Sequence, residues 1–114
     1  MNNLSSKHCV PCEGGAKPLE GEELADYLKQ VKDWQVLPIG EGEDDNRKIS
    51  KEFKFKEFKE SMIFVNKIAN IAESESHHPD VHIFYNTVKI ELWTHAIGGL
   101  SENDFILASK IDNI

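Results

Sequence analysis

The sequence predicts an α+β fold of the order αββαββα, in which a four-stranded antiparallel sheet carries its helices on one face. Three observations lead to this class. Three segments have apolar residues at helical spacing, four short segments have the alternation or the composition of strands, and polar or glycine-containing runs separate them. The length of 114 residues fits a single domain.

The chain is expected to begin with an irregular extension at 1–18, followed by a domain at 19–114. The extension is rich in Gly, Pro, Ser and Cys and has no periodicity. After it, leucine and valine residues recur at helical spacing, and acidic residues in the first turn complement the helix dipole. This pattern predicts a first helix over about 22–32.

A hairpin and a longer helix are expected next. Residues 34–39 have the composition of a strand, the polar run 40–46 is typical of a hairpin loop, and 48–55 alternates between apolar and polar side chains. The period then changes to that of a helix, which predicts a second helix over about 57–75.

Two further strands are predicted at 81–85 and 88–94. In the second of them, Trp93 and His95 fall on the face opposite to the apolar one. This face of the sheet must therefore be solvated, covered by another subunit or used as a site. The strand edges of so small a sheet also favour pairing between subunits.

The chain is expected to end in a third helix. Gly98 and Gly99 interrupt the preceding strand, and Ser101 stands three residues before Asp104 in the manner of a capping box. The helix is predicted over about 102–112.

The charge of the chain narrows the classes of partner. The net charge is −7, so no excess of basic residues is present to neutralise phosphates of nucleic acid or of an anionic membrane. No apolar run approaches the length of a membrane span, and the first residues lack the hydrophobic core of a signal peptide. The simplest expectation is a soluble cytoplasmic protein, and the charge does not argue against a small neutral ligand.

The two cysteines form one CxxC motif, Cys9 to Cys12, with His8 before it. One such motif is at most half of a zinc ribbon, and the βαβ context of a thioredoxin-type redox motif is lacking. We expect reduced thiols in a loosely ordered leader. Metal binding between chains or a redox role is the alternative.

Four histidines fall within a short part of the chain: His77, His78, His82 and His95. Their nitrogens would be sufficient for zinc, but adjacent residues of an extended backbone point in opposite directions. No HExxH or 2-His-1-carboxylate spacing accompanies them. We therefore expect no metal site, and a metal-dependent hydrolase remains an alternative.

Acid–base chemistry is the other use of these imidazoles, because their ordinary pKa of about 6.5 is near neutral pH. Glu73 precedes His77 by four residues, and a carboxylate there or at Asp104 could orient an imidazole. Pro79 restricts the backbone of His78. We interpret His8 and His82 as surface residues. The pattern alone does not decide between these roles.

The spacing of Glu73, His77-His78-Pro79, Tyr85, His95 and Asp104 resembles the signature of the pterin-4a-carbinolamine dehydratases. The runs FKFKEF, YNTVKIELWTH and GGLSENDFILASKID are also similar to the family, as is the tryptophan at Trp34. The resemblance covers about residues 19–112, and every signature position matches.

The resemblance implies the αββαββα fold, a homodimer or homotetramer, and no metal or bound cofactor. The implied reaction is dehydration of 4a-hydroxytetrahydrobiopterin to quinonoid dihydropterin, in the recycling of tetrahydrobiopterin. The substrate is the carbinolamine that aromatic amino acid hydroxylases release. The elimination involves only the pterin ring, so the side chain of the pterin and the pathway stay open.

The resemblance also implies site residues. His77, His78, His95 and Glu73 are the expected catalytic group, with His77 and His95 as the acid–base pair and Glu73 holding an imidazole in its working tautomer. The expected substrate-binding residues are His78, Asp104, Trp34 and Tyr85.

A binding module is the competing interpretation. Some proteins similar in sequence act as dimerisation cofactors of a transcription factor or as assembly factors of other enzymes. Non-enzymatic relatives tend to lose signature histidines, whereas this chain has all three, which favours an enzyme.

Overall fold

The computed structural model describes residues 4–10, 17–39 and 47–114 and confirms the predicted order of elements. Its helices and strands are α1 (Gly21–Leu28), β1 (Gln35–Pro38), β2 (Arg47–Lys54), α2 (Phe58–Glu75), β3 (Asp80–Phe84), β4 (Thr87–Leu92) and α3 (Glu102–Asp112). Two short 3₁₀ turns are added, η1 (Leu4–Ser6) and η2 (His95–Ile97). The expected loop at 40–46 lies outside the described residues.

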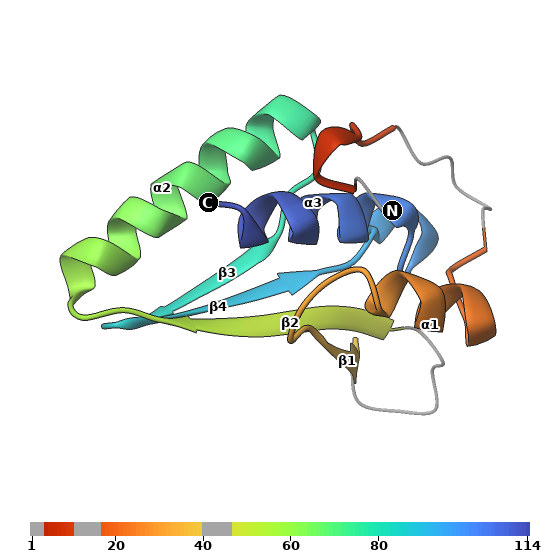
Figure 1. Ribbon diagram of the computed structural model, residues 1–114, viewed down its shortest axis with the longest axis horizontal. Helices are drawn as coiled ribbons and strands as arrows, with labels where there is room; N and C mark the ends of the chain where they lie inside the picture. Colours follow the sequence, from red (N-terminus) through yellow and green to blue (C-terminus); the bar gives the residue numbers. More distant parts are fainter. Residues whose placement is uncertain (1–3, 11–16, 40–46) are drawn as a thin grey trace.

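The four strands form one antiparallel sheet in the order β1-β2-β4-β3. The long strand β2 and the strand β4 are central, and β1 and β3 are the edges. Figure 1 shows α2 and α3 above one face of this sheet, with α1 beside α3. The predicted α+β arrangement with helices on one face is therefore confirmed.

The two faces of β4 differ as the alternation predicts. Val88, Ile90 and Leu92 are fully buried beneath the helices. On the opposite face, Glu91 Oε2 lies 2.8 Å from Lys48 Nζ, and its Oε1 lies 2.9 Å from His82 Nε2. Burial opposes the ionisation of Glu91, but these two hydrogen bonds, with the charges of Lys48 and Lys89, outweigh it, so the pKa of its carboxyl is below its usual value.

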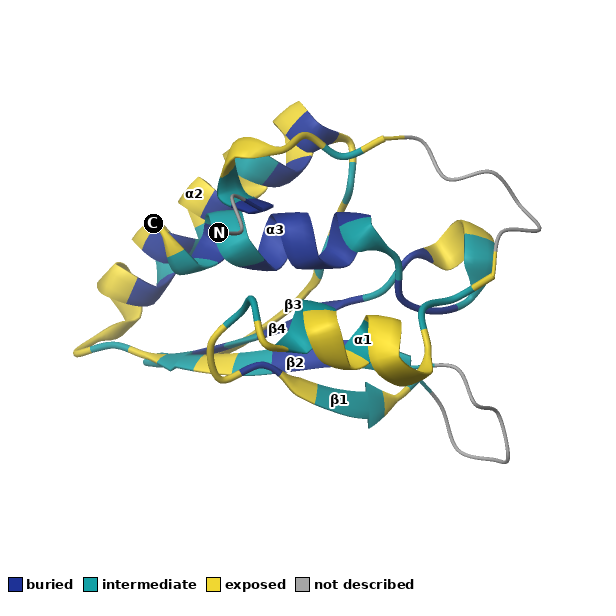
Figure 2. Cartoon of the chain, turned by 45° about the vertical axis from the view of Figure 1, so that its right-hand side comes forward, coloured by how far each residue is buried: buried dark blue, intermediate teal, exposed yellow. Residues whose placement is uncertain are grey.

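Helix α3 is the centre of the core, and Figure 2 shows it mostly in the colour of buried residues. The predicted capping box begins it, with Ser101 and Asp104 bonding reciprocally. Helix α1 packs against it through Tyr27, whose ring stacks on Phe105 at 5.3 Å and whose hydroxyl donates to Glu102 Oε2 at 2.9 Å. Burial and this hydrogen bond raise the pKa of Tyr27 to about 12.

Helix α1 ends at Leu28, earlier than the predicted end near residue 32. The amide of Gln30 donates to the Tyr27 carbonyl oxygen, a tighter turn than an α-helix makes, and Asp33 has a positive φ of 63°. The apolar periodicity continues past the helix because Val31 still packs on the core. The helical spacing of apolar residues therefore extends beyond the last residue of the helix.

Residues 4–10 pack on the domain, so the expectation of a loosely ordered leader is wrong for these residues. Leu4 is 2% exposed and belongs to the core. Lys110 Nζ donates to the Ser5 carbonyl oxygen at 2.8 Å, and Lys7 Nζ donates to Glu102 Oε2 at 3.0 Å. Cys12 lies outside the described residues.

In the part of the chain that the structure describes, we find no helix both long enough and apolar enough to cross a membrane.

Candidate active site

A pocket of about 770 Å³ opens where α2 ends, β3 begins and α3 begins. His77, His78 and His95 line it, together with Trp93 and the N-terminal residues His8 to Val10. Its volume is within the range of about 300–1,000 Å³ that is typical of small-molecule sites. Three of the four clustered histidines therefore share one pocket, and His82 is outside it.

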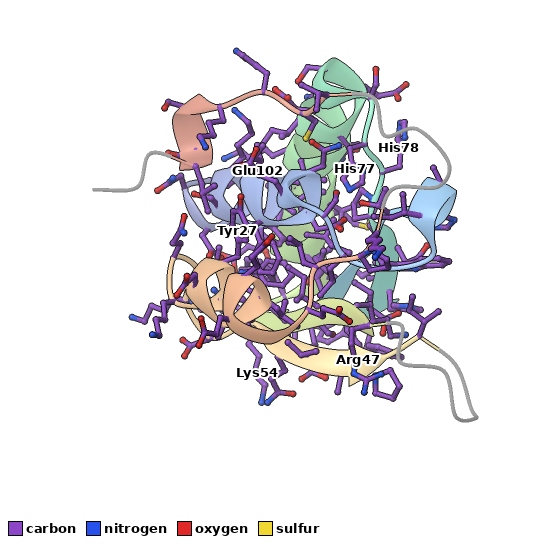
Figure 3. All side chains as sticks on the ribbon, turned by 90° about the vertical axis from the view of Figure 1, so that its right-hand side faces the viewer. Tyr27, Arg47, Lys54, His77, His78 and Glu102 are labelled. Atoms are coloured by element: carbon purple, nitrogen blue, oxygen red, sulfur yellow. The ribbon has the colours of Figure 1, made fainter. Side chains whose placement is uncertain are left out.

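The end of α2 places His77 and His78 at the pocket. Ser76 has a left-handed φ of 53°, and the amide of His77 donates to the Ala72 carbonyl oxygen at 3.2 Å. The amide of Ser76 donates to the Glu73 carbonyl oxygen at 3.4 Å, which completes a Schellman motif. The chain therefore reverses its direction directly before the histidines. Figure 3 shows both side chains at the same end of the molecule.

His77 is paired with Asp104. Its Nε2 lies 2.6 Å from Asp104 Oδ1, and the Asp104 side chain is fully buried. The other carboxylate oxygen, Oδ2, accepts from the Ser101 amide and from the Thr94 hydroxyl, both at 2.9 Å. An ionised carboxylate accepts hydrogen bonds, so Asp104 favours a proton on His77 Nε2 and leaves Nδ1 for proton exchange.

His78 is paired with Glu73 at the rim. Its Nε2 lies 2.6 Å from Glu73 Oε2, and the two side chains are 62% and 77% exposed. Exposed pairs of this kind contribute little energy because water screens them. The expected partner of an imidazole is thus present, but Glu73 contacts His78, while Asp104 contacts His77.

His95 lies in η2, after the end of β4, and lines the same pocket. Its ring stacks on that of Trp93 with centroids 3.8 Å apart and planes 15° apart. Trp93 Nε1 donates to Asp80 Oδ2 at 3.4 Å. β4 ends at Leu92, before the predicted end of this strand at residue 94, so Trp93 and His95 lie beyond the strand, where both line the pocket.

Trp34 and Tyr85 do not line this pocket. Trp34 is 7% exposed, and its Nε1 donates to Asp112 Oδ2 at 3.0 Å, at the end of α3 opposite to Asp104. Tyr85 is 64% exposed and stacks on Phe58 at the turn between β3 and β4. Within one chain, both predicted substrate-binding residues therefore lie away from the histidines, since spacing does not tell at which end of an element a residue lies.

Sequence reasoning missed Glu75 and Asn103, which are buried at the pocket. Burial opposes the ionisation of Glu75, but hydrogen bonds from the Cys9 amide and from His8, with the charge of Lys110, hold the pKa of its carboxyl below its usual value. An available signal was the position of Glu75 in the last turn of α2, where the helix dipole disfavours an acid. A buried acid at this position needs partners from elsewhere in the chain.

The carboxylates and imidazoles of the pocket form separate pairs. Across the described ranges 4–10, 17–39 and 47–114, no three His, Cys, Asp or Glu side chains are placed to hold one metal ion. What the arrangement offers is imidazoles of different burial around one cavity, with His77 the least exposed.

Comparison with known proteins gives one family. Residues 17–114 match the family model described as pterin 4 alpha carbinolamine dehydratase. A protein of Nitrosospira multiformis is 45% identical over 114 residues, which cover 100% of this chain and 94% of the relative. A protein of Rickettsia canadensis is 46% identical over 114 residues, with 99% and 98% covered. Both are provisionally named pterin-4-alpha-carbinolamine dehydratase.

Two solved structures are similar. The crystal structure of a transcriptional coactivator/pterin dehydratase from Brucella melitensis has a TM-score of 0.75 and 31% identity, covering 85% of this chain and 97% of that chain. A pterin dehydratase-like protein, identified as a RuBisCO assembly factor in the alpha-carboxysome, has a TM-score of 0.56. Its identity is 20%, with 70% of this chain and 86% of that chain covered, so this second likeness concerns the fold alone.

Proposed function

The chain belongs to the pterin 4 alpha carbinolamine dehydratase family, and from this premise we propose that it dehydrates 4a-hydroxytetrahydrobiopterin to quinonoid dihydropterin by histidine acid–base catalysis. The observation that carries the proposal is the His77–Asp104 pair at the pocket. An imidazole held by a buried carboxylate has a defined tautomer, as a proton-transfer group requires.

The elimination needs two proton transfers. The bond between C4a and the hydroxyl oxygen breaks, and that oxygen leaves as water after it receives a proton. The proton on N5 is removed, and its electron pair forms the double bond between N5 and C4a. One group must therefore act as an acid and another as a base, and no electron acceptor is needed.

We assign these two transfers to His77 and His95, which line the same pocket. His77 exchanges its proton at Nδ1, because Asp104 occupies Nε2. His78, with Glu73 beside it, binds and orients the pterin at the exposed rim. General acid–base catalysis typically supplies a factor of about 10² to 10⁴ in rate, and both transfers are within its scope.

The test is a stopped-flow dehydration assay on freshly made 4a-hydroxytetrahydropterin. We expect catalysis by the wild type, loss of most of it in His77→Ala, and a normal rate in the control His82→Ala, which lies outside the pocket. His95→Ala is assayed on each of the two C4a epimers, because the epimers present the hydroxyl on opposite faces of the pterin ring. A full rate for His95→Ala on both epimers would remove His95 from the mechanism.

The proposal extends to partners in the same pathway. The substrate would come from an aromatic amino acid hydroxylase, and the dehydratase would act as a homodimer or homotetramer. The edge strand β3 supports self-association, since Val81, Ile83 and Phe84 are all exposed on it. Light scattering coupled to size exclusion gives the number of subunits, and a monomer at working concentration would contradict this part.

A non-enzymatic role is the second candidate, as a dimerisation cofactor or an assembly factor of the same fold. The shared fold with a RuBisCO assembly factor supports it. Retention of His77, His78 and His95 favours the enzyme. A stoichiometric partner in a pull-down, together with no dehydration in the assay, would reverse the order of the two candidates.

A further inference from the structure

We infer that His8 to Val10 form a strap that positions the His77–Asp104 pair from outside the catalytic signature. The inference rests on the proposed function for its kinetic test. The strap lies across the pocket end of the molecule, and Figure 1 shows the N-terminal segment beside the C-terminal end of α2. It contacts α2 on one side and α3 on the other.

The contact with α2 is made at Glu75, a side chain only 6% exposed. The amide of Cys9 donates to Glu75 Oε1 at 2.7 Å, and His8 Nδ1 lies 2.9 Å from Oε2. Hydrogen bonds to a charged acceptor are among the stronger ones in proteins. Glu75, two residues before His77, therefore holds the main chain of the strap in a fixed position.

The contact with α3 is made at Asn103, which is 4% exposed. The amide of Val10 donates to Asn103 Oδ1 at 3.0 Å, and Asn103 Nδ2 donates to the Val10 carbonyl oxygen at 2.6 Å. The Cys9 thiol lies 3.6 Å from the Asn103 carbonyl oxygen. The side-chain amide of Asn103 thus bonds both main-chain groups of Val10. Asn103 is the residue directly before Asp104.

The strap consequently joins the two elements whose residues form the pair. His77 follows α2 and Asp104 lies in the first turn of α3, so their 2.6 Å separation depends on how these two ends sit relative to each other. Leu4, which is buried in the core, anchors the chain just before the strap, and the exposed pair of Lys7 with Glu102 adds little to it. Small displacements matter, since about 1 Å can cost about 100-fold in rate.

A purely structural role is the competing explanation, in which the strap only supplies partners for buried Glu75 and Asn103. In that case its release would lower stability and leave the His77–Asp104 geometry unchanged. The two explanations differ in what happens to the ring nitrogens of His77 and to the pH profile of the reaction.

The test compares Val10→Pro with Val10→Ala in the full chain. Both lose the valine side chain, which is 64% exposed, but proline also removes the amide that donates to Asn103. Hydrogen exchange at residues 4–10 checks that the strap is released, and thermal melting checks that the fold persists. Asn113→Ala is the control, because the side-chain amide of this asparagine donates to the Ser109 carbonyl oxygen at the far end of α3.

The expected result is a kcat for Val10→Pro about 10-fold below that of Val10→Ala, within the 100-fold range for a displacement of about 1 Å, with a smaller change in KM. The pH profile of kcat should also move, and the ¹⁵N shifts of the His77 ring should change in the free protein. Asn113→Ala should alter none of these. A released strap with unchanged kcat and unchanged His77 shifts overturns the inference.

A second pair of variants acts from the other side of the strap. Glu75→Gln keeps an acceptor for the Cys9 amide, whereas Glu75→Ala removes it, so glutamine should restore the His77 shifts and the kcat that alanine loses. Equal effects of the two variants on both readouts would contradict positioning by the strap. If the wild type does not dehydrate the pterin, the proposed function fails, while the His77 shifts still decide this inference.

Discussion

His77 Nε2 and Asp104 Oδ1 lie 2.6 Å apart, although the two residues belong to different helix ends and are 27 positions apart in the chain. Asp104 has two structural duties as well, since its second oxygen completes the capping box of α3 and accepts from Thr94. The same carboxylate therefore fixes the start of the central helix and the orientation of the pocket imidazole. Changes at Asp104 should affect both.

Asp104→Asn should lower kcat by about 10² to 10⁴. The amide can keep its oxygen toward Ser101 and Thr94, which turns its NH₂ toward His77 and favours the other tautomer of the imidazole. Stopped-flow dehydration measures the loss. Asp112→Asn is the matched control at the far end of α3, and a wild-type rate for Asp104→Asn would show that the pair is not needed.

Glu73→Gln should reduce kcat far less than Asp104→Asn. Both partners of the His78–Glu73 pair are exposed, so water can replace the lost carboxylate. The same assay compares the two variants side by side. A larger loss for Glu73→Gln than for Asp104→Asn would reverse the assignment of the two histidines.

Ser76→Gly should raise the free energy of unfolding, by up to about 1 kcal/mol. Ser76 has a φ of 53°, a conformation that costs a residue with a Cβ atom about 1–2 kcal/mol, and the greater freedom of glycine in the unfolded chain offsets part of this gain. Urea unfolding measures it. Ser74→Gly, on the exposed side of the same helix end, should instead lower stability by about 0.5 kcal/mol.

Glu75→Gln should reduce the decrease in the free energy of unfolding that the wild type shows as the pH falls. The pKa of Glu75 is lowered in the folded state, so its contribution is present above the pKa of the unfolded chain and is lost as the pH falls through the folded value. Unfolding free energies at neutral and acidic pH, measured for both proteins, give the difference in slope. Identical slopes would mean that the Cys9 amide and His8 do not stabilise the ionised form.

Tyr27→Phe should remove a loss of stability at alkaline pH. The pKa of Tyr27 is raised to about 12, so its contribution is complete below the unfolded value of about 10 and disappears as the pH rises toward 12. At neutral pH the variant should be less stable by about 1 kcal/mol, for the lost hydrogen bond to Glu102. Absorbance titration of Tyr85→Phe follows Tyr27 alone, and a midpoint near 10 would contradict the prediction.

The fold was predictable because its signals are local. Alternation marked β2, helical spacing marked α2, and Ser101 with Asp104 marked the start of α3, all within a few residues. The helix ends were less certain: Val31 continues the apolar period beyond the end of α1, because a side chain can pack on the core from a turn.

The site was predictable in its histidines and less so in their partners. The resemblance to the family grouped His77, His78 and His95, which line one pocket, but which carboxylate contacts which imidazole depends on how the elements pack. Trp34 and Tyr85 do not line the pocket within the single chain, and their positions in the sequence do not show at which end of an element they lie. The strap left no periodic signal, because its contacts use main-chain groups that every residue has.

The contacts of the strap span 66 residues between Cys9 and Glu75 and 93 between Val10 and Asn103. Closing loops of such length is slow in folding, since entropy must be lost before the contacts can form. During synthesis the strap could bind Asn103 only after that residue had left the ribosome. The pocket should accordingly be one of the last regions to form when the protein folds.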